Sequence, residues 1–121
     1  MNITRPIFME INLDNFDHNM ASIREKIGPD VSIMPVIKAN AYGTYLNTRL
    51  DILNQFDIVA VATVDEGVFI RNLGYRRQIF VLNQPYESEI EKIIAYNIIV
   101  GISSYDFARK LGETGEPIKV H

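Results

Sequence analysis

The chain of 121 residues contains no cysteine, no tryptophan and only two histidines. Without thiols, neither a disulfide framework nor a thiolate metal site can form, and a reducing compartment is compatible with the sequence. The two histidines, His18 and His121, are roughly 100 positions apart and lack the spacing of metal ligands. The seven glycines are scattered, which excludes a P-loop and a dinucleotide-binding loop. We therefore expect no metal site and no such phosphate loop.

Charge of one sign and long apolar runs are also scarce. The net charge is −3, and no run of like charges is longer than Arg76-Arg77, so we expect neither nucleic acid nor an anionic membrane as a partner. No apolar run approaches the roughly 18 residues of a membrane-spanning helix. Residues 1–6 lack the apolar core of a signal peptide. We expect a soluble, cytoplasmic protein.

Short apolar runs without alternation recur along the chain, as in strands that are covered on both faces. The predicted strands are residues 7–13, 31–38, 58–62, 78–82, 98–102 and 118–120. Amphipathic segments of helical length separate them, which predicts an α/β fold of parallel βα units. A complete (β/α)8 barrel needs about 250 residues, so this length supplies about half of one.

Helix-start signals follow the predicted strands. The segment Thr63-Val64-Asp65-Glu66 has the pattern of a capping box. Its adjacent carboxylates, Asp65 and Glu66, suggest acid/base chemistry, but capping and the helix dipole explain them better. Further caps are expected at Asp14 and at Ser103 or Ser104.

The most informative segment is Val36-Ile37-Lys38-Ala39-Asn40-Ala41-Tyr42-Gly43, which ends an apolar strand with one lysine and then turns. Catalytic groups collect at the C-terminal ends of parallel barrel strands. Desolvation disfavours the ammonium form, so an amine at this place is a usable nucleophile that can form a Schiff base with a carbonyl. The alternative is a solvated lysine whose stem covers apolar surface.

This octet resembles the cofactor-lysine motif of the alanine racemases, fold-type III enzymes that use pyridoxal 5'-phosphate (PLP), whose pattern reads roughly V-V-K-A-N-A-Y-G. Arg5-Pro6 and residues 10–14 are similar to the opening strand of that family, and residues 61–66 to its third strand. The resemblance covers essentially all 121 residues. The family usually continues the motif with His-Gly, whereas this chain has Thr44-Tyr45, which leaves the start of the next helix open.

The resemblance implies that residues 1–121 are the N-terminal portion of a PLP-binding barrel domain. It implies that Lys38 forms the Schiff base with PLP, that the Tyr42 hydroxyl donates to the cofactor phosphate and that Leu82 packs beside the cofactor ring. By physical argument alone, Tyr42 can also be an aromatic packed over the barrel mouth, and Leu82 an ordinary core leucine. Family members often have a histidine at the position of His18, which we interpret as a structural polar residue.

The implied activity is the isomerase reaction that interconverts L- and D-alanine and supplies D-alanine for peptidoglycan. Lys38 would serve one face of the substrate Cα, and a tyrosine from the C-terminal domain of the partner in a full-length homodimer would serve the other. No residue here matches that tyrosine, so we expect the chain alone to be inactive. The alternatives are a serine-preferring racemase, a non-catalytic PLP-binding barrel protein, and a ligand-free folding or interaction fragment with unpaired strand edges.

Overall fold

The computed structural model describes residues 7–121. They divide into two compact units, residues 7–32 and Ile33–His121. In the described part of the first unit, helix α1 (Leu13–Ile27) begins after Asn12, whose side chain accepts a hydrogen bond from the Asn15 N–H at 2.9 Å. The expected cap at Asp14 is therefore wrong, because the helix begins earlier and places Asp14 in its first turn.

The expected strand at residues 7–13 is also wrong. Residues 7–11 have no regular secondary structure, and Leu13 already belongs to α1. A strand exists only where a neighbouring strand accepts and donates its backbone hydrogen bonds, and none of the backbone bonds of the described residues involves residues 7–11. Ile7 and Phe8 are instead 84% and 74% exposed.

The second unit contains a parallel sheet in the order β1-β2-β3. Its strands are β1 (Ile58–Val61), β2 (Gln78–Val81) and β3 (Ile99–Val100). Single parallel bridges add a segment at each edge, Val36 to Ala60 and Val100 to Val120. Five extended segments thus lie side by side in sequence order, which confirms the α/β class and the parallel arrangement. The predicted strands at residues 31–38 and 118–120 are reduced to these bridges.

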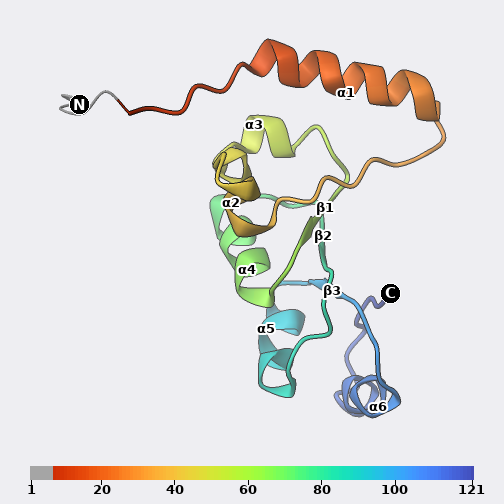
Figure 1. Cartoon of the computed structure of the whole chain (residues 1–121). Helices are drawn as coiled ribbons and strands as arrows, with labels where there is room; N and C mark the ends of the chain where they lie inside the picture. Colours follow the sequence, from red (N-terminus) through yellow and green to blue (C-terminus); the bar gives the residue numbers. More distant parts are fainter. Residues whose placement is uncertain (1–6) are drawn as a thin grey trace. The chain divides into compact units, whose positions relative to one another are not determined.

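Helical segments follow the first four of the five extended segments, and most of them lie beside the strands in Figure 1. They are α2 (Lys38–Tyr42), η1 (Leu46–Thr48), α3 (Leu50–Leu53), α4 (Val64–Leu73), η2 (Glu87–Glu89), α5 (Ile90–Ala95) and α6 (Tyr105–Glu113). The capping box of Thr63 and Glu66 begins α4, as predicted, and Ser104 caps α6. Helix α4 approaches the strands closely because Gly67 has no side chain: an added Cβ would lie 3.0 Å from Ile98 Cδ1.

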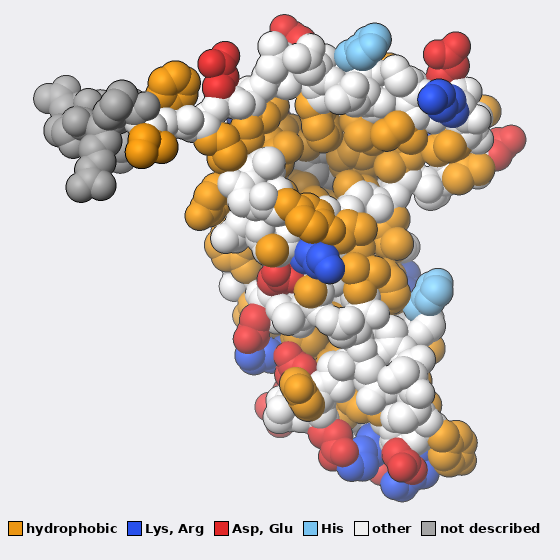
Figure 2. Space-filling view, in the orientation of Figure 1, with side chains coloured by type: hydrophobic (Ala, Val, Ile, Leu, Met, Phe, Trp, Pro, Cys, Tyr) orange, Lys and Arg blue, Asp and Glu red, His pale blue; other side chains and the backbone are white. Residues whose placement is uncertain are grey.

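The core lies between the helices and one face of the sheet. Side chains of Val59, Val61, Ile79 and Val81 are at most 1% exposed. On the opposite face, Val36 and Leu82 are each 38% exposed, and the Phe80 ring packs against the His121 ring with centroids 5.1 Å apart. On the face of the second unit shown in Figure 2, charged side chains gather around α6, away from the hydrophobic area over the strands.

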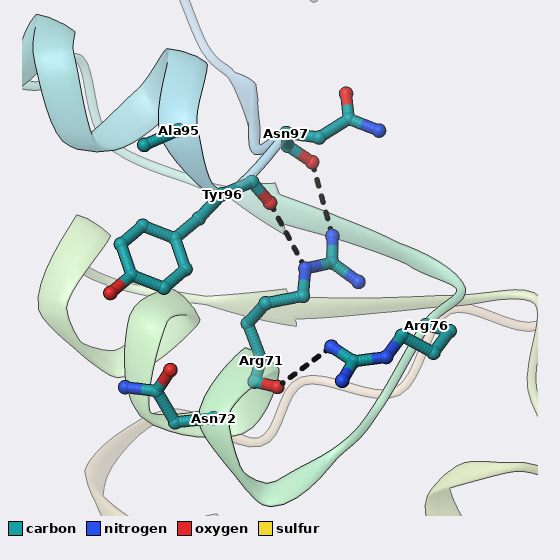
Figure 3. Close-up of a pocket in the computed structure, with 6 residues that line it drawn as sticks. All are labelled: Arg71, Asn72, Arg76, Ala95, Tyr96 and Asn97. Atoms are coloured by element: carbon teal, nitrogen blue, oxygen red, sulfur yellow. Dashed lines mark hydrogen bonds between the residues drawn. The ribbon is translucent and has the colours of Figure 1, made fainter.

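Arg71 holds together the edge of the sheet at which β2 and β3 begin. Its guanidinium donates to four backbone carbonyls, those of Tyr75, Arg77, Tyr96 and Asn97, at 2.8–3.1 Å. Burial lowers the pKa of Arg71, and the neighbouring Arg76 lowers it further. Figure 3 shows that Arg71 and Arg76 line an open cavity of about 480 Å³ together with Tyr96 and Asn97. This cavity lies away from the C-terminal strand ends, where barrel enzymes carry their chemistry.

Tyr75 is a fully buried phenol whose hydroxyl donates to the Phe56 carbonyl at 2.8 Å. Burial raises the pKa of Tyr75 above its ordinary value of 10.0, because the phenolate is poorly solvated there. The neutral form is therefore favoured in the folded state. The stability that the neutral Tyr75 phenol contributes is fully present below pH 10.0, the ordinary pKa. It is lost as the pH rises through the raised pKa of the folded state.

We predict that Tyr75→Phe lowers the free energy of unfolding at pH 7 by about 0.5–1.5 kcal/mol, because the Phe56 carbonyl loses its partner. The variant should also lose less stability than the parent as the pH rises above about 10, the ordinary pKa of tyrosine, since the titrating group is gone. Denaturant unfolding across this range measures both effects. Tyr105→Phe, at a tyrosine that is 81% exposed, is the control and should change neither. An identical alkaline loss in Tyr75→Phe and the parent contradicts the assignment.

Candidate functional site

Lys38 and Leu82 lie at the same edge of the sheet. Lys38 comes two residues after Val36, which pairs with Ala60. Leu82 comes two residues after Phe80, which pairs with the same alanine. Residues in register on parallel strands lie side by side, so Lys38 and Leu82 each follow the C-terminal end of an extended segment, and one strand separates the two segments. Lys38 is half-buried, and Leu82 is 38% exposed.

The chain turns immediately after Lys38 through backbone of left-handed conformation. Four successive residues, Ala39, Asn40, Ala41 and Tyr42, have φ between 51° and 56°. Left-handed backbone costs L-residues about 1–2 kcal/mol each, because Cβ crowds the following carbonyl oxygen. The turn is closed by bonds from Ala41 N–H to Ile37 O and from Gly43 N–H to Ala39 O, both at 3.0 Å. The Lys38 amine is thus carried by a strained turn, which further contacts must stabilise.

That support comes from Glu66 in the first turn of α4. Its Oε1 accepts from the Ala39 N–H at 2.8 Å, and its Oε2 accepts from the Ala62 N–H at 2.7 Å. The N-cap of α2, Ile37, provides no side-chain acceptor, so the carboxylate satisfies a donor that the start of a helix otherwise leaves free. Bonds to a charged acceptor are stronger than neutral ones. Sequence reasoning assigned Glu66 to capping alone, because no local pattern links positions 27 residues apart.

Two further side chains join neighbouring strand ends. Asn83 Nδ2 donates to the Ala62 carbonyl at 3.3 Å. Gln84 Oε1 accepts from both the N–H and the hydroxyl of Ser103, at 2.8 and 3.0 Å. Gly101 allows β3 to end close to its neighbour, since an added Cβ would lie 3.1 Å from the Leu82 carbonyl oxygen. The loops at this edge are therefore connected to one another by polar side chains.

The segment Thr44-Tyr45 leads from the turn into two short helical segments. Tyr45 has φ 58° and precedes η1 without donating a side-chain cap, and α3 then has only four residues. Asn47 in η1 is buried, and its Oδ1 has no hydrogen-bond partner within the described part of the chain. It lines a cavity of about 260 Å³ on the helix side of the sheet, beside Ile37 and Val61. The polar Asn47 oxygen therefore lies in an interior cavity directly behind the turn.

The remaining predicted residues lie apart from this edge or project into solvent. Tyr42, at the end of the turn, is 67% exposed. His18 is an exposed residue of α1 in the first unit, and its carbonyl accepts from the Ser22 hydroxyl. Across residues 7–121, no three His, Cys, Asp or Glu side chains are grouped as metal ligands. Over the same residues, every helix is too short or too polar to span a membrane.

Comparison with known proteins gives a consistent result. Residues 11–121 match the family model described as alanine racemase, N-terminal domain. Alanine racemase 2 of Caldanaerobacter subterraneus subsp. tengcongensis is 31% identical over 97% of this chain and 32% of its own length. The alanine racemase of Clostridium difficile 630, in complex with cycloserine, is 33% identical with a TM-score of 0.87, over 99% of this chain and 35% of that one.

A histidine racemase of Leuconostoc mesenteroides subsp. sake is also similar, with a TM-score of 0.74 and 29% identity over 85% of this chain and 29% of that one. The chain spans about a third of the length of the relatives that it matches. Together with the parallel sheet, these matches confirm the predicted fold, a partial TIM-like (β/α)8 barrel, and the family resemblance.

We predict that Ala39→Gly raises the free energy of unfolding by about 0.5–1 kcal/mol, because glycine adopts positive φ without the Cβ penalty. The same substitution at Ala108, inside the right-handed helix α6, should lower it by about 1 kcal/mol. Denaturant unfolding of both variants tests the opposite signs. If Ala39→Gly destabilises the protein as much as Ala108→Gly, the left-handed turn is not the conformation in solution.

Proposed function

We propose that this chain, which belongs to the family of the alanine racemase N-terminal domain, provides the cofactor-binding lysine of a PLP-dependent amino-acid racemase. Alanine is the proposed substrate. The observation that supports this proposal is the position of Lys38, half-buried at a C-terminal strand end and followed by a strained, braced turn. Residues held in unfavourable backbone conformations concentrate at functional sites.

The side chains at this edge fit PLP by their chemistry. A primary amine at Lys38 can bind the cofactor aldehyde, a phenol at Tyr42 can donate to a phosphate oxygen, and Leu82 offers an apolar surface to a flat ring. When bound, PLP takes up the electron pair that remains on the substrate Cα after its proton leaves. The exposure of Tyr42 and Leu82, 67% and 38%, leaves both available to a ligand.

Each residue has a separate task in the proposed reaction. Lys38 would hold the cofactor through its amine and would take or return the Cα proton on one face of the substrate. Tyr42 would donate to the phosphate, and Leu82 would offer an apolar contact to the ring. Racemisation also needs a proton donor and acceptor on the opposite face, and positioned groups of this kind contribute typically about 10²–10⁴-fold each. We propose that this group comes from the remainder of a full-length homodimer.

The choice of amino acid is a separate matter from the role of Lys38. A histidine racemase shares this part of the barrel, so substrate preference depends on contacts outside the lysine turn. Alanine is favoured by the alanine racemases among the relatives, and a serine preference is the alternative. We also propose that the enzyme is cytoplasmic and supplies D-alanine for peptidoglycan. A non-catalytic PLP-binding protein is less consistent with the Ala39–Gly43 sequence, which such single-domain barrel proteins usually lack.

We predict that PLP followed by borohydride labels Lys38, because its amine lies at the strand end where the cofactor binds. Peptide mapping identifies the modified residue. Lys38→Arg should abolish the label, whereas Lys92→Arg, at an exposed lysine paired with Asp65, should keep it. A label on Lys26, Lys92, Lys110 or Lys119 in place of Lys38 contradicts the assignment.

We predict that Tyr42→Phe weakens PLP retention by about 0.5–3 kcal/mol, the range for a hydrogen bond to a charged or neutral group. The melting temperature should hardly change, because the ring is 67% exposed. Equilibrium titration with PLP and thermal unfolding measure the two quantities. Tyr45→Phe removes a hydroxyl from the same loop and is the matched control. Equal losses of affinity and melting temperature would favour an aromatic that only packs over the site.

A further inference from the structure

We propose that Glu66 is a positioning residue for Lys38. Its carboxylate fastens the peptide unit between Lys38 and Ala39 to the end of β1, and it thereby fixes the direction in which the amine leaves the backbone. This inference rests on the proposed function, since it concerns the group that would bind the cofactor. It adds a role outside the lysine motif, on a helix that follows the next strand.

The geometry of the carboxylate supports this role. Oε1 accepts from Ala39 N at 2.8 Å, and this nitrogen belongs to the peptide plane that begins at the Lys38 carbonyl. Oε2 accepts from Ala62 N at 2.7 Å and from Thr63 N at 3.3 Å. One carboxylate therefore bridges the ends of two adjacent extended segments, and a shift of either end would break a charge-assisted hydrogen bond.

Capping alone does not account for the arrangement. The capping box of α4 needs one oxygen of Glu66 on the Thr63 N–H and the Thr63 hydroxyl on the Glu66 N–H. The other oxygen could remain in water, yet it contacts a residue 27 positions earlier. Glu66 takes part in none of the ion pairs found among residues 7–121, whereas the neighbouring Asp65 is paired with Lys92. The carboxylate is thus committed to backbone donors.

Three variants of the protein separate positioning from capping. Glu66→Gln keeps the shape but places an amide N–H₂ against one of the two bridged donors, so it opens one side of the bridge. Thr63→Ala damages the same capping box and leaves the bond to Ala39 in place. Asp65→Asn removes one negative charge from the same helical turn without touching the bridge. Glu66→Asp keeps the charge and is too short to span both ends, which provides a second test if Glu66→Gln does not fold.

Amide hydrogen exchange of Ala39 without PLP is the first measurement, with the Ala108 amide in α6 as the reference for global opening. We expect exchange at Ala39 to be about tenfold faster in Glu66→Asp, the factor for the loss of one hydrogen bond to a charged acceptor. In Glu66→Gln, exchange should be faster at Ala39 or at Ala62, according to which of the two donors the amide N–H₂ faces. Thr63→Ala and Asp65→Asn should accelerate Ala39 no more than Ala108. The rate of borohydride-trapped PLP labelling at Lys38 is the second measurement, and it should fall only in the two Glu66 variants.

The outcomes are distinguishable. Unchanged exchange at Ala39 in both Glu66 variants, or an equal acceleration in Thr63→Ala, overturns the positioning role. Faster exchange with an unchanged labelling rate also overturns it, because the bridge would then not affect the amine. Absence of label at Lys38 in the parent protein contradicts the proposed function instead, and the exchange comparison still shows whether Glu66 fastens the turn.

Discussion

The position of the amine depends on a backbone that turns with the opposite hand to an ordinary helix. Ala39 to Tyr42 all have positive φ, which L-residues adopt at a cost that local contacts must offset. A right-handed helix beginning at Lys38 would continue away from the strand end, whereas the left-handed turn reverses the chain within a few residues. Gly43, with φ 84°, ends the turn where a side chain would add further strain. The short, unfavourable turn keeps Lys38 directly at the end of its strand.

The rest of the second unit provides the contacts that offset the unfavourable free energy of this turn. The parallel register aligns the ends of the extended segments, so a side chain from one loop reaches the backbone of the next. Glu66, Asn83 and Gln84 each make such a contact. The opposite edge is held by Arg71, which binds four carbonyls with one guanidinium. Side chains that bind backbone groups therefore connect the loops at both ends of the strands.

Local patterns predicted the parts of this structure that depend on local chemistry. The central strands β1 and β2 were predicted to within one residue, because short, apolar, β-branched runs suit strands buried by helices. The box at Thr63 and the cap at Ser104 depend on residues three positions apart. The strand predicted at residues 7–13 was wrong because a strand forms only beside a neighbouring strand, which an apolar run in the sequence does not specify. The left-handed turn was missed because alanine and tyrosine disfavour positive φ, and one of the contacts that support it, that of Glu66, comes from 27 residues further along the chain.

The substitution of Thr44-Tyr45 for the usual His-Gly shows which contacts the lysine depends on. Tyr45 takes a left-handed conformation that glycine adopts at lower cost, and Asn47 Oδ1 in η1 is buried without a partner in the described structure. Yet the turn is held by main-chain bonds from Ala41 and Tyr45, at 3.0 and 2.8 Å, and by a carboxylate outside the motif. Thr44 adds to these bonds, since its hydroxyl donates to the Ala41 carbonyl at 2.7 Å. The backbone that carries Lys38 is therefore hydrogen-bonded with Thr44-Tyr45 at these positions.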